Sequence, residues 1–184
     1  PEALKAGIRG RPDIISIDGG STDSGPASLG SDTSKYSRAA VKAEWKVLMM
    51  AREEAQVPLV IGSCGTCGTN SMVDWMEDIT IELAKELGQS IKISKLYCEQ
   101  DKDFIKTNFI SNKIHPLDPA PLIDIKISSE MTHIVALAGA EQIQEALKTK
   151  ADIILAGRTT DTAIIAALPL LKGAHPGSAW HGAK

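Results

Sequence analysis

Short apolar segments that end at a glycine or an acidic residue recur along this chain, and a stretch with helical spacing follows each of them. The predicted strands are residues 13–17, 58–62, 90–97, 133–137 and 152–156. Because the segments lack a regular polar alternation, both faces of their sheet should be covered. The pattern predicts an α/β fold: a Rossmann-like three-layer sandwich with a mainly parallel sheet of about five strands and helices on both faces.

The stretches between these strands carry apolar residues at helical spacing. The predicted helices are residues 35–55, 72–87, 102–112, 141–148 and 162–171. The last of them is apolar all round and is therefore expected to be buried. Residues 113–128 contain three prolines and are predicted to cross the molecule without regular structure.

Composition excludes several classes of protein. The net charge is −3, and the basic residues form no run that would suit nucleic acid. No apolar stretch is long enough to span a membrane. Three cysteines do not form a disulfide framework, so we expect a cytoplasmic protein. Residues 1–184 are interpreted as a single α/β domain, and the missing initiator Met suggests a fragment of a longer chain.

Polar residues follow the predicted strands. Parallel strands place these residues on one edge of the sheet, called the rim here, where α/β proteins bind ligands. The acidic candidates for acid–base catalysis there are Asp18, Glu99, Asp101 and Asp161. Asp18 could instead hydrogen-bond loop amides, and Asp161, like Thr160, could cap the following helix.

The same rim holds the candidate substrate-binding residues. Arg158 could clamp a carboxylate or phosphate. Glycine loops and helix N-termini would offer N–H groups to an anion or a developing oxyanion. The full set of binding candidates is Gly19, Gly20, Ser21, Thr22, Asp23, Ser63, Gly65, Thr66, Arg158, Thr159, Thr160 and His181. Asp23 could also serve as a metal or hydroxyl ligand, but the sequence predicts no metal site and leaves the cofactor unknown.

Cysteine and histidine patterns are less specific. Cys64 and Cys67 form a C-x-x-C, but no second ligand pair exists, so a glycine loop that cradles an acyl or phosphate group is favoured over a redox or zinc site. His181 beside Trp180 could be an acid–base group or could pack in a core. His133, inside a predicted strand, is interpreted as structural.

Several motifs together resemble one known family. They are DGGSTDSGP at 18–26, LG at 29–30, SRAAVK at 37–42, PLVIGSCGTCG at 58–68, EQDK at 99–102, ADIILAGRTTDTA at 151–163 and PGSAWHGAK at 176–184. In this order they resemble the acyclic terpene utilisation protein AtuA family. The family often has Ala in place of Cys64 and Cys67, which weakens a redox role further. The resemblance implies a cytoplasmic protein in the breakdown of branched acids, including terpenoid acyl-CoA.

The sequence therefore favours a catabolic enzyme that acts on a small carboxylate or branched acyl-CoA by lyase- or hydratase-type proton chemistry. A homo-oligomer or a partner subunit is expected, with neither nucleic acid nor membrane as a partner. One alternative is a nucleotide- or phosphate-binding protein, because DGGST alone looks like the phosphate loop of actin and the sugar kinases. That loop is the turn of a hairpin, whereas a Gly/Pro/Ser-rich stretch follows Asp23. The other alternative is a non-catalytic subunit that binds acyl-CoA.

Overall fold

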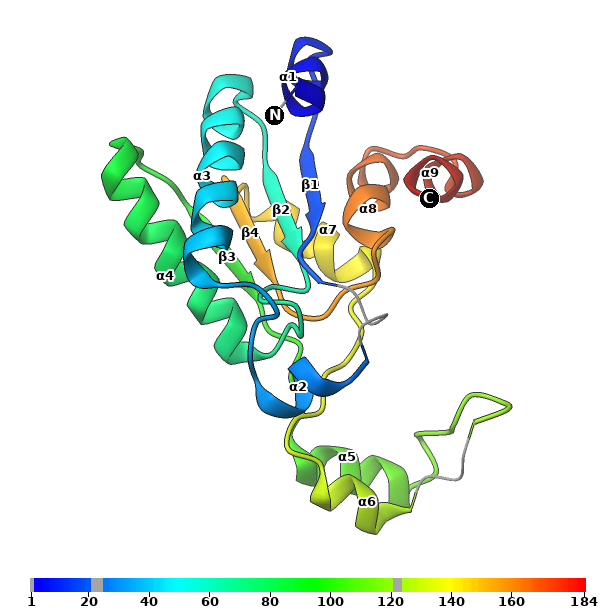
Figure 1. Ribbon diagram of the computed structural model, residues 1–184. Helices are drawn as coiled ribbons and strands as arrows, with labels where there is room; N and C mark the ends of the chain where they lie inside the picture. Colours follow the sequence, from blue (N-terminus) through cyan, green and yellow to red (C-terminus); the bar gives the residue numbers. More distant parts are fainter. Residues whose placement is uncertain (1, 21–24, 121–123) are drawn as a thin grey trace.

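A parallel β-sheet forms the centre of the molecule (Figure 1). The computed structural model describes residues 2–20, 25–120 and 124–184. Within these residues the sheet has four strands in the order β1-β2-β4-β3. The strands are β1 (Ile15–Asp18), β2 (Leu59–Gly62), β3 (Ile93–Leu96) and β4 (Ile153–Ala156). All neighbouring strands run parallel. The predicted three-layer α/β sandwich is confirmed, with four strands rather than five.

Helices cover both faces of the sheet (Figure 1). On one face lie α3 (Arg38–Ala55) and α4 (Asn70–Leu87), with α1 (Glu2–Arg9) against α3. On the other lie α7 (Ala140–Lys148) and α8 (Ala163–Leu171). Strand β2 alternates between the two cores, because Leu59 and Ile61 pack with the first set of helices and Val60 with the second.

The order of the strands explains why the helices divide in this way. The chain moves across the sheet in one direction from β1 to β2 and then β3, and it steps back from β3 to β4. Right-handed crossovers in opposite directions place their helices on opposite faces. The loops after the adjacent strands β2 and β4 therefore lead to opposite faces, which opens a crevice between the two strand ends. Ligands of open α/β sheets bind in such a crevice.

The strand predicted at residues 133–137 does not form, and this expectation was wrong. Residues 134–136 lie beside 98–100 in the antiparallel sense, with Gln100 N–H donating to Ile134 O at 2.8 Å and Ala136 N–H to Cys98 O at 2.7 Å. Ala138 then pairs with Thr159, past the end of β4. The segment therefore crosses the rim instead of joining the sheet.

Residues 101–120 and 124–132 leave the sheet at the end of β3 and project from the rim (Figure 1). This arm carries α5 (Lys102–Ile110) and α6 (Ile125–Glu130), which pack on each other. Part of the segment predicted to be irregular, 113–128, is thus helical. The short helix α2 (Ala27–Ser31) lies between β1 and α3, and α9 (Pro176–Ala183) packs on α8.

Helix α8 is not buried on every side, contrary to the expectation from its composition. Ile164 is 1% exposed and packs in the second core, whereas Ile165 is 43% exposed. Helix α8 packs on the sheet, on α7 and on α9, and Ile165 lies on the part of its surface that these contacts leave exposed.

None of the helices in the described part of the chain combines the length and the apolar character that crossing a membrane requires.

Candidate functional site

The loops that follow β2 and β4 interlock at the crevice between these strands. Ser63 N–H donates to Gly157 O at 2.8 Å, and Arg158 N–H donates to Gly68 O at 3.1 Å. Gly68 has a φ of +69°, and a Cβ on it would lie 2.4 Å from Arg158 N. Only glycine allows so close an approach of the two backbones. This contact between the two loops fixes the backbone of Arg158 and therefore the place where its side chain begins.

Arg158 connects the ends of three strands. Its guanidinium Nη1 donates to Gly20 O at 3.3 Å, beyond β1, and to Ser63 Oγ at 3.2 Å, beyond β2. The residue is 9% exposed, and Ser63 is fully buried. A buried guanidinium keeps its charge, because arginine does not lose its proton in proteins. The crevice therefore holds a fixed positive charge.

A cavity of about 380 Å³ opens beside Arg158, and we call it the rim cavity. Its lining combines apolar side chains with the guanidinium and small polar groups. The lining residues are Gly25, Pro26, Ser28, Leu29, Thr66, Cys67, Val135, Leu137 and Arg158. This described lining includes neither a carboxylate nor an imidazole. The cavity suits a small ligand with an apolar body and a negatively charged or carbonyl oxygen.

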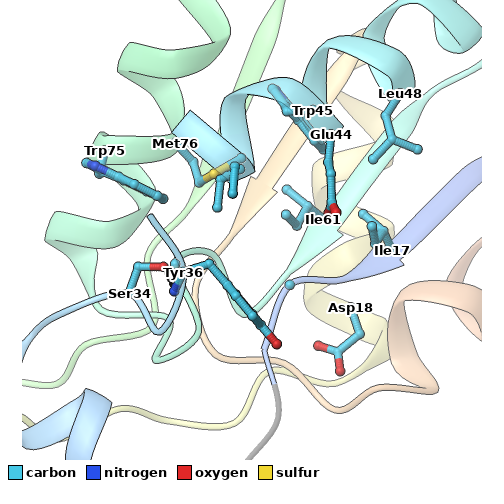
Figure 2. A pocket seen from close by; sticks show the side chains of 14 residues that line it. Ile17, Asp18, Ser34, Tyr36, Glu44, Trp45, Leu48, Ile61, Trp75 and Met76 are labelled. Carbon is cyan, nitrogen blue, oxygen red and sulfur yellow. Dashed lines mark hydrogen bonds between the residues drawn. The ribbon is translucent and has the colours of Figure 1, made fainter. Parts of the chain in front are cut away.

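A second cavity, the α3 cleft, has a volume of about 360 Å³ and lies between the end of β1 and α3 (Figure 2). Its walls are apolar and include Trp45, Ile61 and Met76. Two carboxylates, Asp18 and Glu44, also line it. In Figure 2 the Tyr36 ring extends across the mouth toward Asp18. Because its two carboxylates can each carry a negative charge, this cleft disfavours an anionic ligand.

The carboxyl group of Asp18 has an unusual electrostatic environment. Partial burial raises its pKa above the ordinary value, and the carboxylate of Asp161 adds to the effect. The Gly20 N–H, which donates to Asp18 Oδ1 at 3.1 Å, and the charge of Arg158 act in the opposite direction. A carboxyl group with a raised pKa is closer to the proton affinity that acid–base chemistry at neutral pH needs.

A tight backbone contact separates the two cavities. A Cβ on Gly20 would lie 2.2 Å from Thr66 O, so the two loops touch there. Gly19 and Gly65 line the α3 cleft, whereas Thr66 lines the rim cavity. The structure therefore places Asp18 and Arg158 in adjacent cavities and not in the same one.

The remaining predicted residues are distributed around the rim. Asp101 Oδ1 accepts a hydrogen bond from Phe104 N–H at 2.9 Å and caps α5. Thr159 is buried, and Thr160 N–H donates to Ala138 O at 3.1 Å. Asp161 is exposed just before α8, whose N-cap residue is Thr162. Neither Thr160 nor Asp161 is therefore the N-cap residue.

Some predicted residues are not brought to the rim or cannot be placed. His181 lies on α9, which packs against α8 far from α2 and the rim (Figure 1). It lines neither of the two cavities. The three binding candidates Ser21, Thr22 and Asp23 lie outside the described residues.

A comparison with protein families identifies the chain. The model of the acyclic terpene utilisation family protein AtuA matches residues 22–172. The chain belongs to the AtuA family. No curated protein and no solved structure gives a significant match. The AtuA match includes every residue that lines the rim cavity, whereas Asp18 and His181 lie outside it.

The cysteines of this AtuA member are buried free thiols. Burial raises the pKa of Cys64 and of Cys98 above the usual range for a thiol. A thiol with a raised pKa is a poor nucleophile and a poor metal ligand at neutral pH. Among the described residues no group of three or more His, Cys, Asp or Glu is arranged to hold a metal ion.

His133 is the residue at the AtuA rim that sequence reasoning missed. The sequence favours a structural role, but the structure places His133 Nδ1 2.6 Å from Glu99 Oε1. The two residues are 34 positions apart and do not form a motif. The only sequence signal was the pair of polar residues, Glu99 and Asp101, directly after a predicted strand.

Proposed function

We propose that this protein is a cytoplasmic enzyme of acyclic terpene or related acid breakdown. It acts on a small carboxylate or branched acyl-CoA by lyase- or hydratase-type proton chemistry. Membership of the AtuA family supports the metabolic role. The three free thiols fit a reducing compartment.

One observation carries the proposed substrate class: the buried Arg158 guanidinium lines a cavity whose walls are mostly apolar. Leu29, Val135 and Leu137 supply branched aliphatic walls. Transfer of a hydrocarbon tail from water to such walls is favourable. A carboxylate or thioester oxygen at the head of the same molecule would meet the guanidinium. The volume of about 380 Å³ is near the lower end of the usual range for ligand sites, which favours a small ligand.

The proton-transfer group in this proposal lies at the border of the cavity. Asp18, with its raised pKa, lines the adjacent cleft, and Glu99 lies at the rim beyond β3. The N-termini of α4 and α8 follow the loops of the crevice, and their N–H groups suit a developing negative charge.

Substitution of Leu137 tests the proposal without disturbing the core, because the side chain is 57% exposed while it lines the cavity. Leu137→Glu introduces a negative charge at the cavity and should weaken the binding of 3-methylbutanoate or 3-methylbutanoyl-CoA about tenfold or more. The matched control is Leu117→Glu on the arm, where the side chain is 88% exposed and outside the cavity. The measurement is isothermal titration calorimetry with each ligand.

The proposal also predicts how the protein responds to other ligands. ATP with Mg²⁺ should bind more weakly than the branched acid, because the rim cavity is mostly apolar. Binding of ATP with Mg²⁺ alone would favour the nucleotide-binding alternative. If Leu137→Glu and Leu117→Glu bind the acid equally well, the rim cavity is not the binding site.

A further inference from the structure

Glu99, His133 and the wall of the rim cavity belong to one short antiparallel pairing. Glu99 lies directly opposite Val135. Side chains of opposed residues in an antiparallel pair project to the same face, and alternate residues of an extended segment share a face. His133, Val135 and Leu137 are alternate residues, and the last two line the rim cavity. The pairing therefore places Glu99 and His133 on the same side as Val135 and Leu137, next to the rim cavity but not in its lining.

Glu99 is held firmly by its neighbours. Oε1 lies 2.6 Å from His133 Nδ1, and Oε2 accepts the Asn70 N–H of α4 at 3.1 Å. The Glu99 backbone N–H donates to Asn70 Oδ1 at 3.3 Å. When Glu99 is ionised it can only accept, so the contact requires a proton on Nδ1. In that tautomer of the neutral ring Nε2 carries the lone pair and is the basic atom.

Two carboxylates lie close to His133. Glu99 faces it from the end of β3, and Asp32, just after α2, acts on it electrostatically. Burial opposes the charge of Asp32, but hydrogen bonds from Ser71 and Thr69 and the proximity of His133 outweigh it and lower the pKa of Asp32. Two carboxylates thus lie near an imidazole that is about one-quarter exposed.

We propose that His133 is the catalytic acid–base residue of the rim cavity and that Glu99 is its positioning residue. This assignment rests on the proposed function. Nε2 removes a proton from the carbon next to the carbonyl of a branched acyl thioester. The electron pair of that C–H bond forms the C=C bond of the enolate, the π pair of the carbonyl moves to its oxygen, and the oxyanion forms beside the positive charge of Arg158. Return of the proton from His133 restores the thioester, so no co-reactant is needed.

Exchange of α-protons with solvent measures this step directly. The wild-type protein is incubated with 3-methylbutanoyl-CoA in D₂O, and proton NMR follows the loss of the α-proton signal. The expected result is enzyme-dependent exchange that falls at least about 100-fold in His133→Gln. Glu99→Gln should reduce exchange less, because the imidazole remains. His115→Gln changes an exposed histidine outside both cavities and should exchange at the wild-type rate.

A rescue experiment separates acid–base catalysis from a structural role. His133→Ala should regain exchange when imidazole is added, with a rate that increases with imidazole concentration. No rescue is expected for Glu99→Gln, whose own imidazole is still in place. The assignment would be overturned if His133→Gln exchanged α-protons at the wild-type rate. It would also be overturned if added imidazole did not restore exchange to His133→Ala.

The outcomes also distinguish this inference from the proposed function. Binding of 3-methylbutanoyl-CoA to His133→Gln, measured by calorimetry, should remain within about threefold of wild type. If wild-type protein binds the thioester but exchanges no α-protons, the assignment of His133 is wrong while binding at the rim cavity stands. If Leu137→Glu and Leu117→Glu bind equally, the proposed site itself fails.

Discussion

Two charged groups, Asp161 and Arg158, act on the proton affinity of Asp18. Partial burial and Asp161 raise the pKa of its carboxyl group, while Gly20 N–H and Arg158 oppose the change. A raised pKa means that the folded protein binds this proton more tightly than the unfolded chain. The protonated carboxyl group therefore contributes stability that is fully present below the ordinary pKa of 3.8. This contribution is lost as pH rises through the pKa that the group has in the folded protein.

Asp18→Asn is expected to raise the thermal unfolding midpoint at pH 7, because it removes a charge that the folded state disfavours. Asn retains Oδ1, so it can still accept the Gly20 N–H. The gain should be small, since Asp18 is only partly buried, and it should disappear near pH 3, where the wild-type carboxyl is protonated. Calorimetry of both proteins from pH 3 to 7 checks this. An equal difference at both ends of the range would contradict it.

Individual residues differ in how well the sequence predicts their place. Asp18, Ser63 and Arg158 each follow an apolar strand, and parallel strands must bring their carboxyl ends to one edge. Their common location was therefore predictable. The separation of Asp18 from Arg158 was not, because it depends on the contact between Gly20 and Thr66, whose loops are far apart in sequence.

At the scale of elements, composition alone gave two wrong predictions. Residues 133–137 are rich in β-branched and aliphatic side chains and favour a strand. They follow a long arm, however, and reach the sheet beyond the ends of β3 and β4, where they can pair only with the segments leaving those strands. Helix α8 is apolar all round, yet it lies in an outer layer, so part of its surface, including Ile165, stays exposed.

Two adjacent isoleucines of α8 provide a matched test of this arrangement. Ile164→Ala should lower the free energy of unfolding by about 2–5 kcal/mol, because it leaves a cavity in the second core. Ile165→Ala removes the same atoms from a side chain that is 43% exposed and should cost far less, about 1 kcal/mol. Urea unfolding followed by circular dichroism gives both values. Equal losses would mean that another surface covers Ile165.

For the whole molecule, the strand order decides where the site forms, and the sequence does not reveal that order. Alternation of strands and helices predicts a parallel sheet, but many orders satisfy it. In the observed order β2 and β4 are neighbours with loops to opposite faces. This places the loops of Ser63 and Arg158 together at the crevice. The site is therefore a consequence of topology as much as of the residues themselves.

The sheet and the arm should also differ in local stability. Every residue of β2 and β4 is buried, whereas α5 has no buried residue and exposes Phe104 and Ile110. Segments with few buried contacts open more often. Hydrogen–deuterium exchange by mass spectrometry should therefore find α5 exchanging much faster than β2 and β4. Helix α4, which buries one face against the sheet, is the internal control and should protect its amides better than α5.

The same measurement tests whether the arm has a partner. Within the described part of the chain α5 packs on α6, so its protection in the isolated chain should not depend on protein concentration. Protection of α5 that equals that of α4 and falls on dilution would contradict this expectation. It would mean that a second copy of the chain covers Phe104 and Ile110, because apolar side chains exposed at 57% and 65% are otherwise left in water.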